Sequence, residues 1–470
     1  MIAKRENNSG QLEQLASFHG QVSPETTAPY LYHDFDVPDG VTRLKVTLRY
    51  RKEGICQLYL SVFGPNGYRG SRMMPGAIGD IAPSLEFAAG TASIGALAGE
   101  IEPGSWRVQL DLERTEYIAD YTVTVEAGYG ESGRDVGPLE IFKPAVHNGR
   151  AGAGWYRGEL HSHSHHSDGQ TTVGEVVASA RKHGLDFLAL TDHFSNAGWP
   201  ELESLSDEHL CVMKGSEITG HRGHANMHGL SGWINPFVDD PEHWSINDAA
   251  RAVHHQGGLF CVNHAFALDL GWRYHEFDWA LADMIEVYHH MEGEGNTAQL
   301  ALWDGLLRAG HRITGVAGTD SHDPWKGRHR LGQAFTAVYA TALEPKAIIE
   351  TLRQGHAYAT LGPKLEFSAS SGTNQAIMGD EIDSESGVNF RIALEQLNFP
   401  ARVIVMQNGF YHKHWDVPAA QDRTELRFET GHTPGSYFRV EVFARGAQSR
   451  IGAGRDWQNT LVLSNPIYLR

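Results

Sequence analysis

The sequence predicts an α/β unit of residues 151–365 that lies between two β-sandwiches of residues 1–150 and 366–470. Three observations support this prediction. Short runs of β-forming residues separated by Gly- and Pro-containing turns fill both ends of the chain, strand-like and helix-like runs alternate in the middle, and the segment 143–154 has the Gly, Pro and Asn content of a linker. A chain of 470 residues also has room for about three domains.

The N-terminal unit is expected to be a β-sandwich because its strand-like runs recur at short, regular spacing. Within the runs, β-branched and aromatic residues alternate or cluster, and the turn sequences PDG, GPNGYRG and EPGS separate them. Spacing of this kind is typical of antiparallel sandwiches. The runs cover residues 31–37, 42–52, 56–64, 105–114 and 120–128.

The central unit alternates strand-like with helix-like runs, which is typical of a parallel barrel or an open parallel sheet. The first helix is expected over 173–183, because Thr172 and Glu175 form a capping box and Gly184 follows as a stop. Further helices are expected over 245–258, with Ser245 as the N-cap, and over 296–310 and 344–356. Strands are expected over 155–161, 186–193, 211–219, 259–265, 284–290, 312–322 and 334–340.

After residue 366 the strand-like runs return without helical periodicity, so a second β-sandwich is expected at the C-terminal end. No internal repeat of fixed period and no low-complexity tract is visible. The runs cover residues 388–397, 401–409, 424–430, 437–446 and 461–469.

The composition limits the classes of partner. Asp and Glu number 57 against 39 Lys and Arg, and the formal charge of −18 disfavours binding to a nucleic-acid backbone or an anionic membrane. The first twenty residues lack the apolar core of a secretion signal, no apolar run is long enough to span a membrane, and three widely spaced cysteines fit a reducing compartment. We therefore expect a cytoplasmic protein with a small-molecule substrate. A homo-oligomer is compatible with the sequence.

Histidines and carboxylates gather where the predicted central strands end. In parallel βα folds, the C-terminal ends of the strands form one face, and catalytic groups collect there. Five strands each deliver His, Asp or Glu to this face, whereas 27 histidines placed at random would scatter over helices and loops. The pattern therefore predicts that these residues form one shared metal-binding centre. These residues are His161, His163, His193, Glu217, His264, Asp320 and His322.

The spacing within two of the motifs suits a shared cation. Residues i and i+2 of a strand point to the same side, so His161 and His163 can bind one ion together, as can Asp320 and His322. Imidazoles combined with carboxylates suit Zn, Mn or Fe. A glutamate among several histidines, here Glu217, can bridge two ions. The sequence thus predicts a centre with at least two divalent metal ions.

The motifs ELHSHSHHSDG, ALTDH, GSEIT, VNH and GTDSH resemble those of the PHP superfamily of metal-dependent phosphoesterases. The segments RGHANMHGL, IEVYH, WDGLLRAG and QGHAYATLGP look more specifically like its carbaryl-hydrolase branch. The resemblance covers about residues 155–365. It implies a distorted (β/α)7 barrel of the PHP type that binds two or three divalent metal ions.

The resemblance also implies a ligand set for each ion, carried over motif by motif. Some members of the family have His where this chain has Asp168, and His228 is the alternative to His224. The first ion would be bound by His161, His163, Glu217 and Asp320, the second by Glu217, His224 and His264, and the third by Asp168, His193 and His322.

Several residues beside the motifs have two interpretations. Asp192 either orients a metal-bound histidine or caps a turn. His289 and His290 either line the mouth of the site or lie on the surface, and His165 and His166 either contact substrate or lie on an exposed loop.

The predicted chemistry is hydrolysis by a hydroxide that bridges two metal ions. His193, Asp320 and His322 are predicted to take part in catalysis as well as in metal binding. Lys326, Arg328 and Arg330 are predicted to bind the substrate, and because Arg pairs with phosphate and carboxylate, they favour a phosphoester or another anionic ester. The alternatives are a carboxyl-ester, amide or carbamate hydrolase, and a non-enzymatic binding protein with a vestigial metal site.

Overall fold

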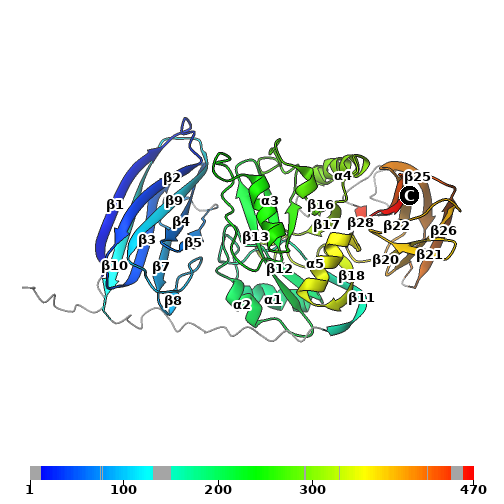
Figure 1. The fold of residues 1–470 in the computed structure, drawn as a ribbon, viewed down its shortest axis with the longest axis horizontal. Helices are drawn as coiled ribbons and strands as arrows, with labels where there is room; N and C mark the ends of the chain where they lie inside the picture. The colour runs from blue at the N-terminus through cyan, green and yellow to red at the C-terminus, as the bar shows by residue number, and fades with distance from the viewer. Residues whose placement is uncertain are drawn as a thin grey trace, which may run out of the picture.

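The computed structural model describes residues 12–74, 76, 78–130, 150–289, 293–327, 329–420, 422–445 and 459–470. The molecule is elongated, with one β unit at the N-terminal end and a second at the C-terminal end (Figure 1). A central unit that contains the helices lies between them (Figure 1). Among the described residues, no helix is long and apolar enough to cross a membrane.

The N-terminal β unit consists of two antiparallel sheets that share one hydrophobic core. Alternate residues point into the core, as do the fully buried Leu44, Val46 and Leu48, which face Leu60 and Val108 of the second sheet. The first sheet contains β1 (Glu13–Val22), β10 (Ala119–Tyr129), β3 (Val41–Lys52), β7 (Ser84–Ala88) and β8 (Thr91–Ala92) in that order, with β6 (Gly79–Ile81) on β3. The second contains β2 (Tyr30–Val37), β9 (Gly104–Thr115), β4 (Cys56–Gly64) and β5 (Gly67–Arg72).

The central strands form one continuous run, which is part of a 15-stranded sheet in the described residues. Neighbouring strands are parallel except around β14 and β18, which run antiparallel to both of their partners. The arrangement is therefore mixed, whereas the sequence predicted a parallel series. In spatial order the strands are β17 (Thr314–Gly318), β16 (Met284–His289), β15 (Leu259–Val262), β14 (Gly223–His228), β13 (Cys211–Gly220), β12 (Phe187–Leu190), β11 (Arg150–Glu159), β18 (Phe335–Leu343) and β19 (Ala357–Thr360).

Strand β17 pairs with β16 through a parallel backbone ladder, and on its other side it is bonded by side chains. Thr336 of β18 bonds through Oγ1 to the amide and carbonyl of Ala317, and Asn465 bonds in the same way to Gly315. These contacts satisfy backbone groups that an edge strand would leave buried and unpaired. Because the sheet is not a closed ladder, the distorted (β/α)7 barrel stays a prediction.

The helices cover the central sheet with amphipathic faces. The predicted capping box at Thr172 and Glu175 is confirmed, and a second one joins Ser245 to Asp248. The last helix ends at Gly355, which has φ 77°, a conformation that favours glycine. The helices are α1 (Val173–Lys182), α2 (Trp199–Ser204), α3 (Ile246–His255), α4 (Gly293–Arg308) and α5 (Pro345–Gln354), with a 3-10 turn at Trp279–Leu281.

The C-terminal β unit is continuous with the central sheet. Strand β19 pairs with β28 (Thr460–Ser464), which leads through β27 (Tyr437–Ala444) and β24 (Ala401–Gln407) to β25 (Phe410–Val417). The predicted domain boundaries at 150 and 365 stay predictions. Backbone hydrogen bonds cross the boundary at 365, because β19 lies before it and β28 lies after it. The second sheet contains β21 (Asn374–Ile377), β20 (Lys364–Ser371), β23 (Val388–Glu395) and β26 (Thr424–Thr430), and β22 (Glu381–Ile382) pairs with β29 (Ile467–Leu469).

The C-terminal unit is also attached to the central unit by a buried ionic cluster. The guanidinium of Arg439 on β27 bonds to both oxygens of Asp304 on α4, at 2.9 and 2.7 Å. Its third nitrogen lies 2.6 Å from Glu441, and all three side chains are nearly inaccessible to solvent. Burial of the two carboxylates is tolerated because both are paired with the same guanidinium.

The interface between the N-terminal and central units contains a second ion pair. Nε2 of His221, in the turn between β13 and β14, lies 2.6 Å from Oδ1 of the buried Asp111 on β9. Burial opposes a charge on His221, but the hydrogen bond to Asp111 and its negative charge outweigh this effect and raise the pKa of His221 to about 9. The imidazole is therefore charged at neutral pH.

We expect this pair to make the stability of the fold depend on pH. Because the pKa of His221 is raised from 6.5 to about 9, the stabilisation from its charged form is lost as the pH rises through 9. Burial raises the pKa of Asp111 to about 6, so the pair is also lost as the pH falls through 6 and is strongest between these two values. The His221→Gln protein should be less stable than the wild type by about 1.5–3 kcal/mol at pH 6.5. Urea unfolding of both proteins from pH 6.5 to 10 should show this difference shrinking. A difference that stays constant over that range would contradict the expectation.

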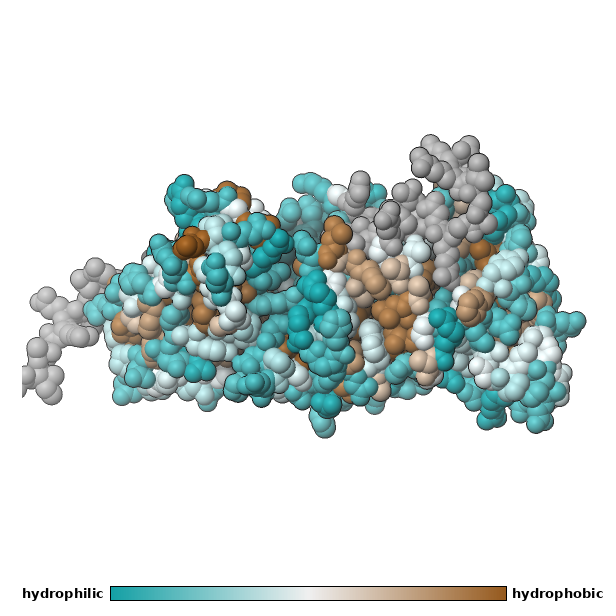
Figure 2. Space-filling model, turned by 90° about the horizontal axis from the view of Figure 1, so that it is seen from above, coloured by the Kyte–Doolittle hydropathy of each residue, from teal (hydrophilic) through white to brown (hydrophobic). Residues whose placement is uncertain are grey.

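The surface shows where apolar side chains gather. Seen from above, hydrophilic colour covers most of the C-terminal end, while the largest apolar patch lies over the middle of the molecule (Figure 2).

Candidate metal centre

The predicted ligands lie at one end of the central strands. His161 and His163 follow β11, His193 follows β12 and His264 follows β15, each just beyond the last strand residue. These three strands thus end earlier than predicted, and the ligands belong to the turns that leave them. Glu217 and His224 lie within β13 and β14, and Asp320 and His322 follow β17.

The backbone at the centre is strained. Of the five non-glycine residues with positive φ in the described residues, three belong to the site: Phe194 next to His193 (59°), His264 (21°) and Asp320 (52°). Side chains other than glycine rarely adopt this conformation, and such strain persists only where the surrounding structure imposes it. The fold therefore fixes these turns in the conformation that directs the side chains inward.

A first donor group contains His161, His163, Glu217 and Asp320, all buried. Nε2 of His161 lies 3.2 Å from Oε2 of Glu217 and 3.3 Å from Oδ1 of Asp320. Nε2 of His163 approaches the same two oxygens at 3.3 and 2.9 Å. Two imidazoles and two carboxylates thus point at one position.

A second donor group uses the other oxygen of Glu217. Oε1 lies 3.2 Å from Nδ1 of His224 and 3.6 Å from Nε2 of His264, and it accepts a hydrogen bond from Asn263 at 2.9 Å. The two oxygens of this single carboxylate therefore face different sets of imidazoles. This is the arrangement expected of a glutamate that bridges two cations.

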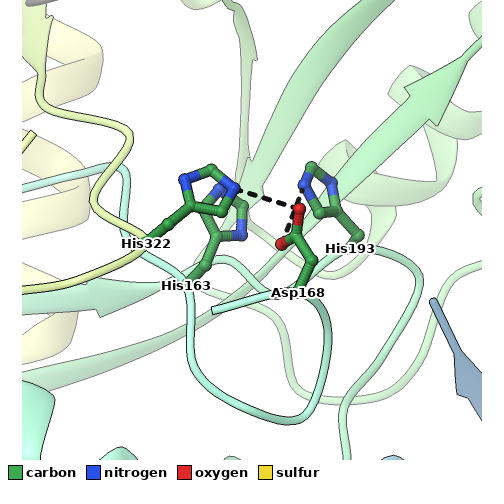
Figure 3. A group of neighbouring side chains, drawn as sticks. All are labelled: His163, Asp168, His193 and His322. Atoms are coloured by element: carbon green, nitrogen blue, oxygen red, sulfur yellow. Dashed lines mark hydrogen bonds and ion pairs between the residues drawn. The ribbon is translucent and has the colours of Figure 1, made fainter. Parts of the chain in front are cut away.

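A third donor group contains Asp168, His193 and His322, with His163 beside them (Figure 3). Oδ1 of Asp168 lies 3.5 Å from Nε2 of His193, and Oδ2 lies 3.1 Å from Nε2 of His322. The side chain of His322 is 31% exposed, whereas those of His161 and His163 are inaccessible. The third group is therefore the one nearest to solvent.

Two further side chains complete the centre. Oε1 of Glu286 lies 2.8 Å from Nδ1 of His161, and Oε2 accepts a hydrogen bond from the amide of His264. His289 is buried, with its Nε2 3.6 Å from Oδ2 of Asp320. The surface interpretation of His289 is wrong, and His290 lies outside the described residues. Glu286 was missed, although a lone glutamate inside the apolar run MIEVY was a signal.

The electrostatics of the centre favour bound cations. Burial opposes a charge on His161, but the carboxylates of Glu217, Asp320 and Glu286 outweigh this effect and raise the pKa of His161 well above its usual value. Burial also opposes charge on Glu217 and Asp320, yet the imidazoles hold the pKa of both carboxyls well below the usual range. Several buried carboxylates together require positive charge nearby. Divalent cations would supply it.

The donor chemistry also fits a metal centre. Within each group, one candidate ligand atom per residue lies within 4.8 Å of the others, and every donor is an imidazole nitrogen or a carboxylate oxygen. Among the described residues, Nε2 of His224 and both ring nitrogens of His289 have no hydrogen-bond partner although they are buried. Such a set suits borderline cations such as Zn, Mn or Fe.

The remaining predicted residues divide into those near the centre and those outside it. Asp192 accepts hydrogen bonds from Ser164 and Ser167 and so caps a loop, which is the second of its two interpretations. His228 is buried four residues beyond His224, with both ring nitrogens unpaired in the described part of the chain. Lys326 and Arg330 are exposed, and Arg328 lies outside the described residues.

Glu286 offers a test of the centre that does not alter a donor within the three groups. A carboxylate that fixes the ring of a metal-binding histidine typically contributes 10- to 100-fold to metal affinity, so Glu286→Gln should weaken binding by about that factor. Calorimetric titration with Zn²⁺ measures it. Glu425→Gln, on the exposed strand β26, is the control. Equal affinity of the Glu286→Gln and wild-type proteins would exclude this role.

Comparison with known proteins points to the same region. Residues 159–249 match the PHP domain family. No curated protein matches the chain. Among solved structures, a two-domain Bacteroides vulgatus protein described as containing a PHP-like metal-dependent phosphoesterase is 19% identical, covers 68% of this chain and 97% of its own, and has a TM-score of 0.36.

Two shorter solved structures are also similar to part of the chain. A Bifidobacterium adolescentis protein named as a metal-dependent phosphoesterase is 17% identical over 37% of this chain and 89% of its own, with a TM-score of 0.27. An amidohydrolase from Chromobacterium violaceum is 19% identical over 36% of this chain and 88% of its own, with a TM-score of 0.27. The segment 159–249, which contains the first ligand motifs from His161 to His228, is thus similar to PHP domains.

Proposed function

We propose that this protein is a metal-dependent hydrolase of the PHP type. The observation that carries the proposal is the position of Glu217, whose two oxygens face two different sets of buried imidazoles. The match of residues 159–249 to the PHP domain supports it, as do the names of the phosphoesterase relatives.

The ligands of the bound ions would be those of the three donor groups. The first ion would be held by His161, His163, Glu217 and Asp320, the second by Glu217, His224 and His264, and the third by Asp168, His193 and His322. Divalent ions bound there would act as Lewis acids and lower the pKa of water, which is the chemistry that hydrolysis requires.

The protein side chains define where the substrate would approach. Nδ1 of His322 is 2.9 Å from the carbonyl of Asp320, to which it donates, so Nε2 is turned toward Asp168 and the solvent side of the centre. Because His322 is the most exposed member of its group, we place the substrate beside it. In this proposal His193, Asp320 and His322 contact the reacting groups.

A protein nucleophile is not part of this proposal. Ser162 lies between two ligands in sequence, but its hydroxyl donates to the carbonyl of Ala189 at 2.8 Å. It is therefore engaged in the fold and is not activated by a histidine base. Hydrolysis by activated water remains the chemistry that the donor groups support.

The substrate class we propose is a phosphoester or another anionic ester, with Lys326 and Arg330 as exposed cations that follow the ligand His322. The second candidate is hydrolysis of a carboxyl ester, amide or carbamate, the chemistry of the carbaryl-hydrolase branch. The resemblance of the motifs IEVYH and WDGLLRAG favours this branch.

An activity panel distinguishes the two candidates. Nitrophenyl phosphate, bis-nitrophenyl phosphate, nitrophenyl acetate and an aryl N-methylcarbamate would be assayed with the Mn²⁺-loaded, Zn²⁺-loaded and chelator-treated protein. We expect metal-dependent turnover of a phosphoester that falls about 10- to 100-fold in kcat/KM in Arg330→Ala, since one charge-assisted contact is worth about 1.5–3 kcal/mol. Turnover of the carbamate alone would support the second candidate, and no metal-dependent turnover of any substrate would count against both.

A further inference from the structure

The loop that carries Asp168 is hydrogen-bonded to the N-terminal β unit. Arg72, the last residue of β5, donates through Nη1 to the carbonyl of His165 at 2.7 Å and to that of Ser167 at 3.4 Å. The amide of Gly95, also in the N-terminal unit, donates to Nδ1 of His166 at 3.2 Å. Three contacts from a separate β unit therefore end within three residues of a predicted metal ligand.

Arg72 is an unusual residue for such a position. Its side chain is partly buried, and burial lowers its pKa. In the part of the chain that the structure describes, it forms no ion pair, and its hydrogen bonds go to the two loop carbonyls. A charge buried without a counter-ion costs free energy. The contact thus sets the position of the loop at some expense in stability.

The opposite side of the loop is held by the central unit. Asp192 accepts hydrogen bonds from the amide and hydroxyl of Ser164, at 2.6 and 2.7 Å, and from the hydroxyl of Ser167 at 2.9 Å. The loop then turns at Gly169, where a Cβ would lie 2.7 Å from the backbone of His163. Asp168 stands between these fixed points, so the position of its carboxylate depends on both units.

A second contact from the N-terminal unit supports the turn that carries His193. Tyr68 of β5 stacks on Trp233 with ring centroids 4.4 Å apart and an angle of 9°. Nε1 of Trp233 donates to the carbonyl of Phe194, the strained residue that follows His193. Residues of β5 therefore support the turns that carry two ligands of the third group, Asp168 and His193.

We propose that the N-terminal β unit positions the third donor group, with Arg72 as the principal positioning residue. The inference rests on the proposed function, because it concerns how one of the proposed metal ions is retained. The ligands of the first two groups lie on or soon after β11, β13, β14, β15 and β17, and Arg72 bonds to none of them, so its loss should affect them less than the third group. The N-terminal unit thereby becomes part of the metal centre rather than an appended domain.

The test compares metal retention in matched variants of the full-length protein. Wild type, Arg72→Gln, Arg72→Lys and Asp168→Ala would be loaded with Zn²⁺, dialysed and analysed for zinc per chain. We expect Arg72→Gln to lose about one ion relative to wild type, as Asp168→Ala does, through a 10- to 100-fold weaker third site. Arg72→Lys keeps the positive charge but lacks the planar guanidinium group. Its zinc content should therefore lie between those of wild type and Arg72→Gln. Arg107→Gln, which removes an exposed arginine of the N-terminal unit, is the control.

Hydrogen exchange gives a readout that does not depend on metal. In Arg72→Gln, a peptide covering residues 164–170 should exchange faster than in wild type, while a peptide covering 211–220 should not change. Thermal melting shows whether the Arg72→Gln protein is folded. If that protein is unfolded, the same comparison is made with Arg72→Lys.

The outcomes separate the two proposals. Unchanged zinc retention and unchanged exchange in Arg72→Gln would overturn this inference alone, as would a wild type that holds only the first two ions. Loss of all zinc from a folded Arg72→Gln protein would also overturn it, because the effect would not be confined to the third group. A wild type that binds no zinc would overturn the proposed function as well.

Discussion

The Glu217→Gln protein is expected to lose both of the deeply buried metal ions and nearly all hydrolytic activity. The substitution keeps the volume of the side chain but replaces one oxygen by a donor nitrogen, which repels a cation on that side. Because each oxygen of Glu217 faces a different donor group, one change affects two sites. We expect kcat/KM to fall by about 10³-fold or more, which corresponds to at least about 4 kcal/mol of transition-state stabilisation.

The measurement combines metal analysis with kinetics on the best substrate of the panel. Glu425→Gln, on exposed β26, should behave as wild type and controls for the loss of a charge. A Glu217→Gln protein that retains two ions per chain would show that Glu217 does not bridge the first two groups. Full activity with one ion lost would show that the chemistry does not require both of the first two ions.

The largest effect on stability is expected at the junction of the central and C-terminal units. Arg439→Leu removes the guanidinium that lies between Asp304 and Glu441 and leaves two buried carboxylates without a cation. Removing one partner of a buried ion pair typically costs about 3–5 kcal/mol, and we expect at least that loss in the free energy of unfolding. Urea denaturation followed by circular dichroism measures it.

Two comparisons make this prediction specific. Arg107→Leu breaks the exposed pair with Asp34 and should cost less than about 1 kcal/mol. A triple variant in which Arg439, Asp304 and Glu441 are all replaced by apolar residues should recover much of the loss, since no buried charge is left unpaired. If the single variant Arg439→Leu is as stable as wild type, the cluster does not hold the two units together.

The position of the candidate metal centre could be predicted from the sequence because its ligands directly follow recognisable strand-like runs. His161 and His193 each close a strand-like run, and the TDH and TDSH motifs supply carboxylates beside histidines. Because β11, β12 and β13 are parallel to one another, as are β15, β16 and β17, the C-terminal ends within each set meet at one edge. The structure brings all nine predicted ligands to that edge.

What the sequence could not show depends on long-range contacts. The run GHANMH lacks β-forming residues, and it forms β14 because β13 and β15 offer backbone partners on both sides. Arg72 contacts its loop partners across 93 and 95 residues of sequence, so no local pattern marks it. Glu286 was visible as a charge in an apolar strand, but its partner His161 is 125 residues away.

The most direct test of the central claim is the metal content of the purified protein. After mild purification, incubation with Mn²⁺ or Zn²⁺ and removal of free metal, elemental analysis should find at least two divalent ions per chain, because Glu217 faces two complete donor groups. Fewer than about one ion per chain under these conditions would contradict a metal centre and with it the proposed hydrolase.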